Sequence, residues 1–149
     1  MLRRIGLWFL AAVVALAVLF VAVLIYQLTV YKPDPPKVAN CTPLQTLITE
    51  DSAAQLYVYH CKRGNEPSWQ GYEVWVEKLA EGDWQRLVTA PQASGCLSIA
   101  LQPGKLTVYH QGSRGHVSVA AASLVYELPA GAASTLSIAT ERVSECPVD

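Results

Sequence analysis

Three histidines and four cysteines are the residues of this 149-residue chain that are best suited to chemistry. Imidazole is the commonest protein ligand of metals, so His60, His110 and His116 are the weak candidates for a zinc or copper site. Their spacing matches no metal-binding motif, and His60 and His110 take the same place in two similar segments. A repeat explains this placement without a metal, and we expect neither a metal nor another cofactor.

The other polar residues form no recognisable catalytic set. The segment 112–115, Gly-Ser-Arg-Gly, differs from the G-x-S-x-G motif, and it lies between two predicted strands instead of between a strand and a helix. The aspartates that could complete a Ser–His–Asp triad fall in predicted loops or at the chain end. Glu73 and Glu77 lie on one strand face beside Arg86, which is typical of an ion-paired surface. We expect a protein that is not an enzyme and has no small-molecule substrate.

The four cysteines, Cys41, Cys61, Cys96 and Cys146, all follow the apolar start of the chain. An even number without a C-x-x-C motif predicts two structural disulfides in an oxidising compartment. Cys41 and Cys146 bracket the domain and could tie its ends together, which would pair Cys61 with Cys96. An internal duplication would instead pair Cys41 with Cys61 and Cys96 with Cys146. The sequence leaves both pairings open.

Residues 5–30 predict a transmembrane helix that contacts membrane lipid. They carry no charge, and a helix of about 26 residues reaches roughly 39 Å, enough to cross a hydrocarbon core of about 30 Å. The segment is longer than the apolar part of a signal peptide and ends without an A-x-A site, so we expect an uncleaved signal-anchor. Arg3 and Arg4 predict a cytoplasmic N-terminus at residues 1–4, with the rest periplasmic or extracellular.

Residues 31–40 predict a stiff, proline-rich spacer, and residues 41–149 one small domain. From residue 37 onward the chain carries eight basic and eleven acidic side chains, a net charge of −3. This balance excludes the basic footprint of a nucleic-acid-binding protein.

Short runs of β-branched and aromatic residues, separated by turn residues, predict an all-β domain. About eight antiparallel strands at this spacing favour a sandwich. The predicted strands are residues 44–49, 55–61, 71–79, 84–90, 96–101, 105–111, 117–127 and 134–143.

An internal repeat could divide the sandwich into two pseudo-repeats of four strands. The segments 56–60, Leu-Tyr-Val-Tyr-His, and 106–110, Leu-Thr-Val-Tyr-His, agree at four of five positions. Coincidence within the small alphabet of β sequences is the alternative.

Residues 71–79 and 84–90 predict a hairpin in which Leu79 lies opposite Trp84. This register pairs Glu77 with Arg86 and places Trp75 opposite Val88. One face, with Tyr72, Val74, Val76 and Leu87, is the predicted core. The other face carries the partner-binding hypothesis, because exposed aromatic and arginine side chains are typical of interaction hot spots. Its residues are Trp75, Trp84 and Arg86, with Trp69 nearby.

These features predict a non-catalytic, membrane-anchored subunit that docks an envelope protein through its aromatic face. A first alternative is an immunity or inhibitor protein that neutralises a toxin or hydrolase, which an adjacent toxin gene would indicate. A second is a metal- or ligand-binding β module, which stoichiometric metal in the purified protein would indicate.

Overall fold

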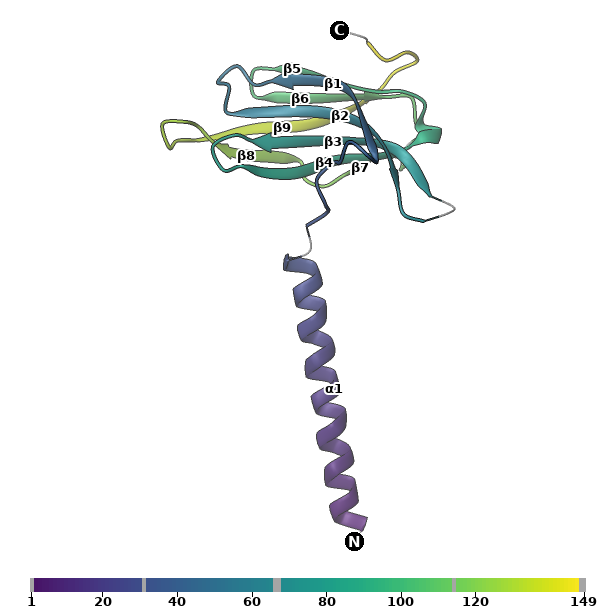
Figure 1. Ribbon diagram of the computed structural model, residues 1–149. Coiled ribbons are helices and arrows are strands. Elements are labelled where there is room, and N and C mark those ends of the chain that lie inside the picture. Colours follow the sequence, from purple (N-terminus) through teal and green to yellow (C-terminus); the bar gives the residue numbers. More distant parts are fainter. Residues whose placement is uncertain (1, 31, 66–67, 114, 148–149) are drawn as a thin grey trace. The chain divides into compact units, whose positions relative to one another are not determined.

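The computed structural model describes residues 2–30, 32–65, 68–113 and 115–147. The chain divides into two compact units, Met1–Pro33 and Asp34–Asp149 (Figure 1). Each unit is described by itself.

The first unit is the single helix α1, Leu2–Val30. Its segment Trp8–Thr29 is 22 residues long, has a mean hydropathy of 3.0 and buries none of its surface inside the structure. By length and composition this helix can cross a membrane, and apolar side chains on every side are typical of a helix in lipid. The helix therefore indicates a single-pass membrane anchor.

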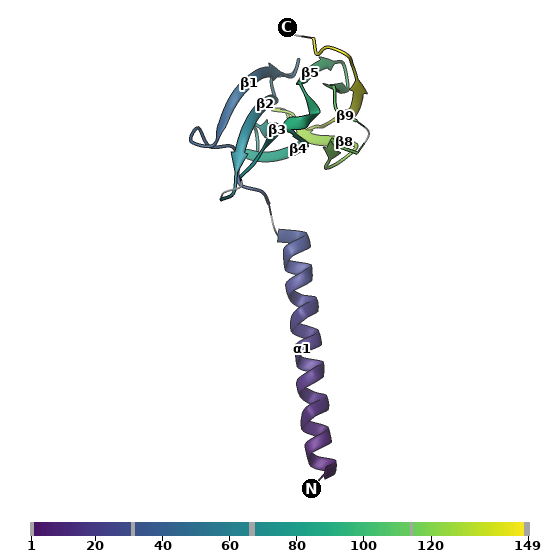
Figure 2. The same ribbon diagram turned by 90° about the vertical axis from the view of Figure 1, so that its right-hand side faces the viewer.

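The second unit consists of two β-sheets that face each other (Figure 2). Sheet A has the strand order β1-β2-β3-β4-β7, and sheet B has the order β5-β6-β9-β8. The prediction of an anchor helix followed by an all-β domain is confirmed. The strands are β1 Cys41–Ile48, β2 Ala54–Arg63, β3 Trp69–Lys78, β4 Asp83–Pro91, β5 Leu97–Gln102, β6 Lys105–His110, β7 Ser118–Val119, β8 Ser123–Glu127 and β9 Ala133–Arg142, with a 3-10 turn at Gln92–Ser94.

The hydrophobic core lies between the sheets and is built by alternation along the strands. Leu56 and Val58 of β2 and Leu106 and Val108 of β6 are fully buried in the same core cluster. Val74, Val76 and Leu87 are buried in the same cluster, with Tyr72 packed against it. The predicted core face of the β3–β4 hairpin is therefore confirmed.

One strand pair departs from the expected antiparallel pattern. β6 and β9 run parallel, while the other pairs are antiparallel. The predicted strand 117–127 is divided, because β7 joins the edge of sheet A and the chain then returns to sheet B as β8. This crossing between sheets replaces a hairpin after β6, and a longer connection permits parallel pairing. Each half of the proposed repeat forms most of one sheet, but the strand orders of the two sheets differ.

The register of the β3–β4 hairpin also differs from the prediction. Lys78 pairs with Asp83, so Glu77 lies opposite Trp84 and Trp75 lies opposite Arg86. The predicted Glu77–Arg86 pair is wrong, since the turn begins one residue earlier than expected. A bulge between Val74 and Trp75 then shifts the pairing again, so that Val88 and Ala90 of β4 lie opposite Val74 and Tyr72 of the core face.

The disulfides join Cys41 to Cys61 and Cys96 to Cys146. Cys41 and Cys61 are directly paired across β1 and β2, with their Cα atoms 4.1 Å apart. The second bridge ties the segment before β5 to the segment after β9, over a separation of 50 residues. Two disulfides in a small domain are typical of an oxidising compartment.

A glutamine side chain closes the sandwich where strands β1 and β5 form the sheet edges. The amide of Gln45 donates to the carbonyl of Ile99 and accepts from its backbone N–H, both at 2.9 Å. This pairing satisfies the exposed backbone of an edge strand in the way that another strand would.

Asp51 fastens the β1–β2 turn to sheet B. Its carboxylate accepts hydrogen bonds from the Thr49 hydroxyl at 2.6 Å, the Ala53 amide at 2.9 Å and the Tyr126 hydroxyl at 2.8 Å. Partial burial raises the pKa of Asp51, but these hydrogen bonds outweigh it and hold the pKa below its usual value of 3.8.

We expect Asp51→Asn to remove part of the acid sensitivity of the fold. A lowered native pKa stabilises the fold above the ordinary pKa of the carboxyl group, and this contribution is lost as the pH falls through the native pKa. The stability gap between the two proteins should therefore be largest near neutral pH and close in acid. Urea unfolding of the full chain in detergent across this pH range measures it, with Glu50→Gln as the neighbouring control. A gap independent of pH would contradict the prediction.

Candidate functional site

The surface of sheet A that faces away from the core carries most of the residues singled out by the sequence. Alternation along β3 puts Trp69, Glu73, Trp75 and Glu77 on this side. Neighbouring strands add Tyr57, Tyr59 and Arg63 from β2, and Trp84 and Arg86 from β4. We call this surface the outer face.

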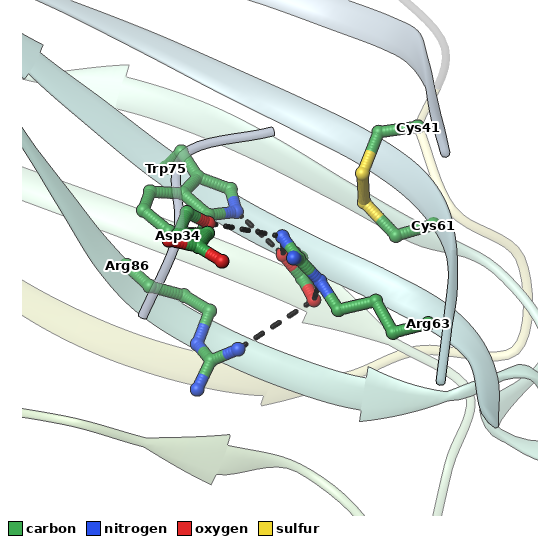
Figure 3. A network of polar contacts seen from close by, with 7 residues as sticks. Asp34, Cys41, Cys61, Arg63, Trp75 and Arg86 are labelled. Atoms are coloured by element: carbon green, nitrogen blue, oxygen red, sulfur yellow. Dashed lines mark hydrogen bonds and ion pairs between the residues drawn. A yellow bond between two sulfur atoms is a disulfide. The ribbon is translucent and has the colours of Figure 1, made fainter. Parts of the chain in front are cut away.

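A buried carboxylate organises the outer face (Figure 3). Glu73 is 0% exposed, and its oxygens accept three hydrogen bonds from two side chains. The Arg63 guanidinium donates from Nε at 2.6 Å and from Nη2 at 2.8 Å, which is a bidentate pair. The indole Nε1 of Trp75 donates to Glu73 Oε2 at 2.6 Å. Arg86 adds an ion pair at 3.6 Å.

These contacts explain why a charge is tolerated inside the protein. Burying a carboxylate is costly unless it is paired and hydrogen-bonded, and a bidentate arginine meets both conditions. The guanidinium carbons of Arg63 and Arg86 also lie 5.9 Å from the Trp75 ring centroid, so each cation interacts with the indole face. Arg63, Glu73, Trp75 and Arg86 thus form one interlocked group, which we call the Glu73 network.

The structure corrects the predicted exposure of Trp75. The sequence placed its side chain on the outer face, which is where it lies, but Trp75 is 0% exposed. Arg63 and Arg86 reach it from the strands on either side. Arg63 also donates to the backbone carbonyl of Asp34 at 3.3 Å, which brings the spacer onto the same face. A partner therefore cannot contact Trp75 directly and would contact the side chains that cover it.

Trp84 belongs to a row of half-buried aromatic side chains. Its ring stacks on Tyr57 with centroids 5.1 Å apart, and Tyr57 stacks on Tyr59 at 5.7 Å. We call Tyr59, Tyr57 and Trp84 the aromatic row. Trp84 was among the predicted partner-binding residues, whereas Tyr57 and Tyr59 were not predicted. The signal was present, since Tyr57 and Tyr59 alternate with the core residues of β2.

Hydrogen bonding holds the aromatic row in place. The Tyr57 hydroxyl donates to Glu77 at 2.9 Å. Burial, this hydrogen bond and the Glu77 charge raise the pKa of Tyr57 to about 12. Tyr57 is thus a neutral, fixed donor at physiological pH, and its ring also stacks on two neighbouring aromatic rings.

Trp69 packs differently from the other tryptophans. Its ring lies over Gly71, where a Cβ would come within 2.5 Å of a ring carbon. Gly71 therefore makes room for the half-buried Trp69 at the end of the outer face. Trp69 extends this face beside Arg63, its register partner on β2.

The three histidines are not brought together. His60 contacts the ring of Tyr72 at 5.3 Å, His110 is buried at the end of β6, and the exposed His116 lies 3.2 Å from the Ser113 hydroxyl. Within the described residues, Cys41, Cys61 and Glu73 are the group whose potential ligand atoms lie within 4.8 Å of one another. The two sulfurs are bonded to each other and Glu73 is bound to Arg63, so this group is already occupied.

Comparisons with models of protein families, with curated proteins and with solved structures find no match for this chain. The outer face offers a stacked, half-buried aromatic row beside two arginines that are fixed by a buried carboxylate.

Proposed function

We propose that this protein is a non-catalytic, membrane-anchored interaction subunit whose β domain docks an envelope protein on the outer face of sheet A. Helix α1 acts as a signal-anchor, with Arg3 and Arg4 on the cytoplasmic side and the disulfide-bonded domain in the periplasm or extracellular space. Disulfides, which need an oxidising compartment, support this orientation.

The aromatic row is the observation that carries the proposal. Tyrosine, tryptophan and arginine are the residues most enriched at the energetic centres of protein interfaces. Tyr57, Tyr59 and Trp84 present aromatic area with their rings already stacked, so little side-chain entropy is lost when a partner covers them. Arg86 lies beside them with its side chain about one third exposed, 32%.

The extended shape of this surface favours a protein over a small molecule. Small-molecule sites are concave, whereas the outer face is built from residues of three adjacent strands, and none of its aromatic row lines a described pocket. The Glu73 network lies beneath it and fixes the strands in place. In this proposal Trp84, Arg86, Tyr57 and Tyr59 contact the partner, while Trp75 and Trp69 support them.

Site-specific photo-crosslinking tests the proposal in the native membrane. A photoreactive residue at position 86 should crosslink the full-length chain to one stoichiometric protein, and the same residue at Val125, exposed on sheet B, should not. Trp84→Ala should weaken capture by about 30-fold, which corresponds to the loss of about 2 kcal/mol typical of a hot spot. Equal crosslinking from both positions, or recovery of the chain alone, would refute the proposal.

The identity of the crosslinked protein separates two roles. A component of an envelope assembly would define the chain as an assembly subunit. A toxin or hydrolase whose activity falls on binding would define it as an immunity or inhibitor protein.

A further inference from the structure

One end of the sandwich opens into a polar pocket of about 590 Å³. It lies beside the parallel pair β6–β9 and the loop that follows β6. Its volume is in the range of about 300–1,000 Å³ that is typical of small-molecule sites. The described residues that line it are His110, Ser113, Gly115, Val117, Thr140 and Arg142.

The strand register explains why polar side chains gather at this place. Leu106 and Val108 point into the core, and alternation turns His110 to the same side. In the parallel register Val108 lies beside Thr140, and His110 lies beside Arg142. Neighbouring residues in register face the same side of a sheet, so the apolar row of the core continues as the polar row of the pocket.

One ring nitrogen of the histidine in this row lacks a hydrogen-bond partner. His110 is 7% exposed, and its Nδ1 atom has no partner among the residues that the structure describes. Buried polar atoms in native proteins nearly always have one, because an unmade hydrogen bond is costly. The unpartnered Nδ1 atom is itself buried, so a bound molecule would contact the rest of the imidazole, which forms part of the pocket wall.

The chemistry of the lining indicates the kind of occupant. Among the lining residues that the structure describes, Arg142 is the one charged side chain, and none is a carboxylate. A guanidinium binds a carboxylate through two parallel hydrogen bonds, and Ser113 and Thr140 add hydroxyl groups. We propose that this pocket binds a small organic acid, with its carboxylate on Arg142 and its polar body against His110.

This site is separate from the proposed docking surface. The pocket uses the inward side of sheet B and its following loop, whereas the aromatic row lies on the outer face of sheet A. A variant that loses binding at one of these sites therefore leaves binding at the other site testable.

Histidine NMR on the full-length chain in detergent micelles tests the pocket. The chain has three histidines, so ¹³C labelling of their rings gives three signals. Citrate and succinate, added against chloride at matched ionic strength, should shift the His110 signal saturably and leave His60 unchanged. Arg142→Gln should weaken this binding at least tenfold, since hydrogen bonds between charged groups are the strong ones. Lys105→Gln removes the same charge from the opposite end of β6 and should bind like the parent protein.

Several results would overturn the assignment. Absence of a saturable His110 shift at millimolar citrate and succinate would remove the site. Equal binding by Arg142→Gln would show a general salt effect, and tighter binding of inorganic phosphate would show an oxyanion site instead of a carboxylate site. Both substituted residues are exposed, so unchanged thermal midpoints should show that each variant folds.

Discussion

Replacing Glu73 with alanine is expected to lower the free energy of unfolding by about 3 kcal/mol, because it removes one partner of a buried ion pair and leaves the other in place. Glu73 itself is 0% exposed, whereas the side chains of Arg63 and Arg86 are 26% and 32% exposed. Those arginines can turn toward water when the carboxylate is lost. The loss of unfolding free energy therefore stays near the lower end of the range for a broken buried ion pair. Trp75 would also lose the acceptor of its indole N–H.

Urea unfolding of the full-length chain in detergent, followed by tryptophan fluorescence, measures this loss. Glu81→Ala is the matched control, since Glu81 forms an exposed pair with Lys78 at 3.5 Å. Exposed pairs contribute at most about 1 kcal/mol. If Glu73→Ala costs no more than Glu81→Ala, the Glu73 network does not hold the outer face together.

Removing the Cys96–Cys146 bridge is expected to cost about 4 kcal/mol, from the loop-entropy relation for its separation of 50 residues. The bridge holds the segment that follows β9 against the start of β5. Without it, the unfolded chain gains the freedom of a long open loop, while the strands keep their backbone hydrogen bonds. The effect therefore acts mainly through the unfolded state.

A double-mutant cycle distinguishes this bridge from ordinary packing. Cys96→Ala, Cys146→Ala and the double variant should each lose the same stability, because any one of them abolishes the same bond. Full-length proteins in detergent, compared by urea unfolding under oxidising conditions, provide the measurement. Losses that add in the double variant would mean that the cysteines contribute through separate contacts.

Local patterns in the sequence were enough to predict the main elements. An uninterrupted apolar run predicts α1, because a helix in lipid needs no partner to satisfy its backbone. Alternation placed Val74 and Val76 in the core, and Trp75 and Trp84 on the opposite side of sheet A. These features depend on the period of a strand, which is local, so the sequence determined them by itself.

Only the tertiary structure decided what lies around those side chains. Trp75 is buried because Arg63 and Arg86 reach it from different strands and Glu73 binds its indole, and no local pattern reports such contacts. The register of the β3–β4 hairpin depended on a one-residue change in where the turn begins. The parallel pairing of β6 with β9 depended on the crossing of β7 to sheet A.

The disulfide pairing and the polar pocket have the same origin. Cys96 and Cys146, like His110 and Arg142, are far apart in the chain and meet through the order of strands in sheet B. The sequence by itself determined the anchor, the all-β class and the sidedness of each strand, because these follow from local hydrophobic periodicity. The neighbours of each strand, and therefore the Glu73 network and the pocket, were decided by non-local packing of the two sheets.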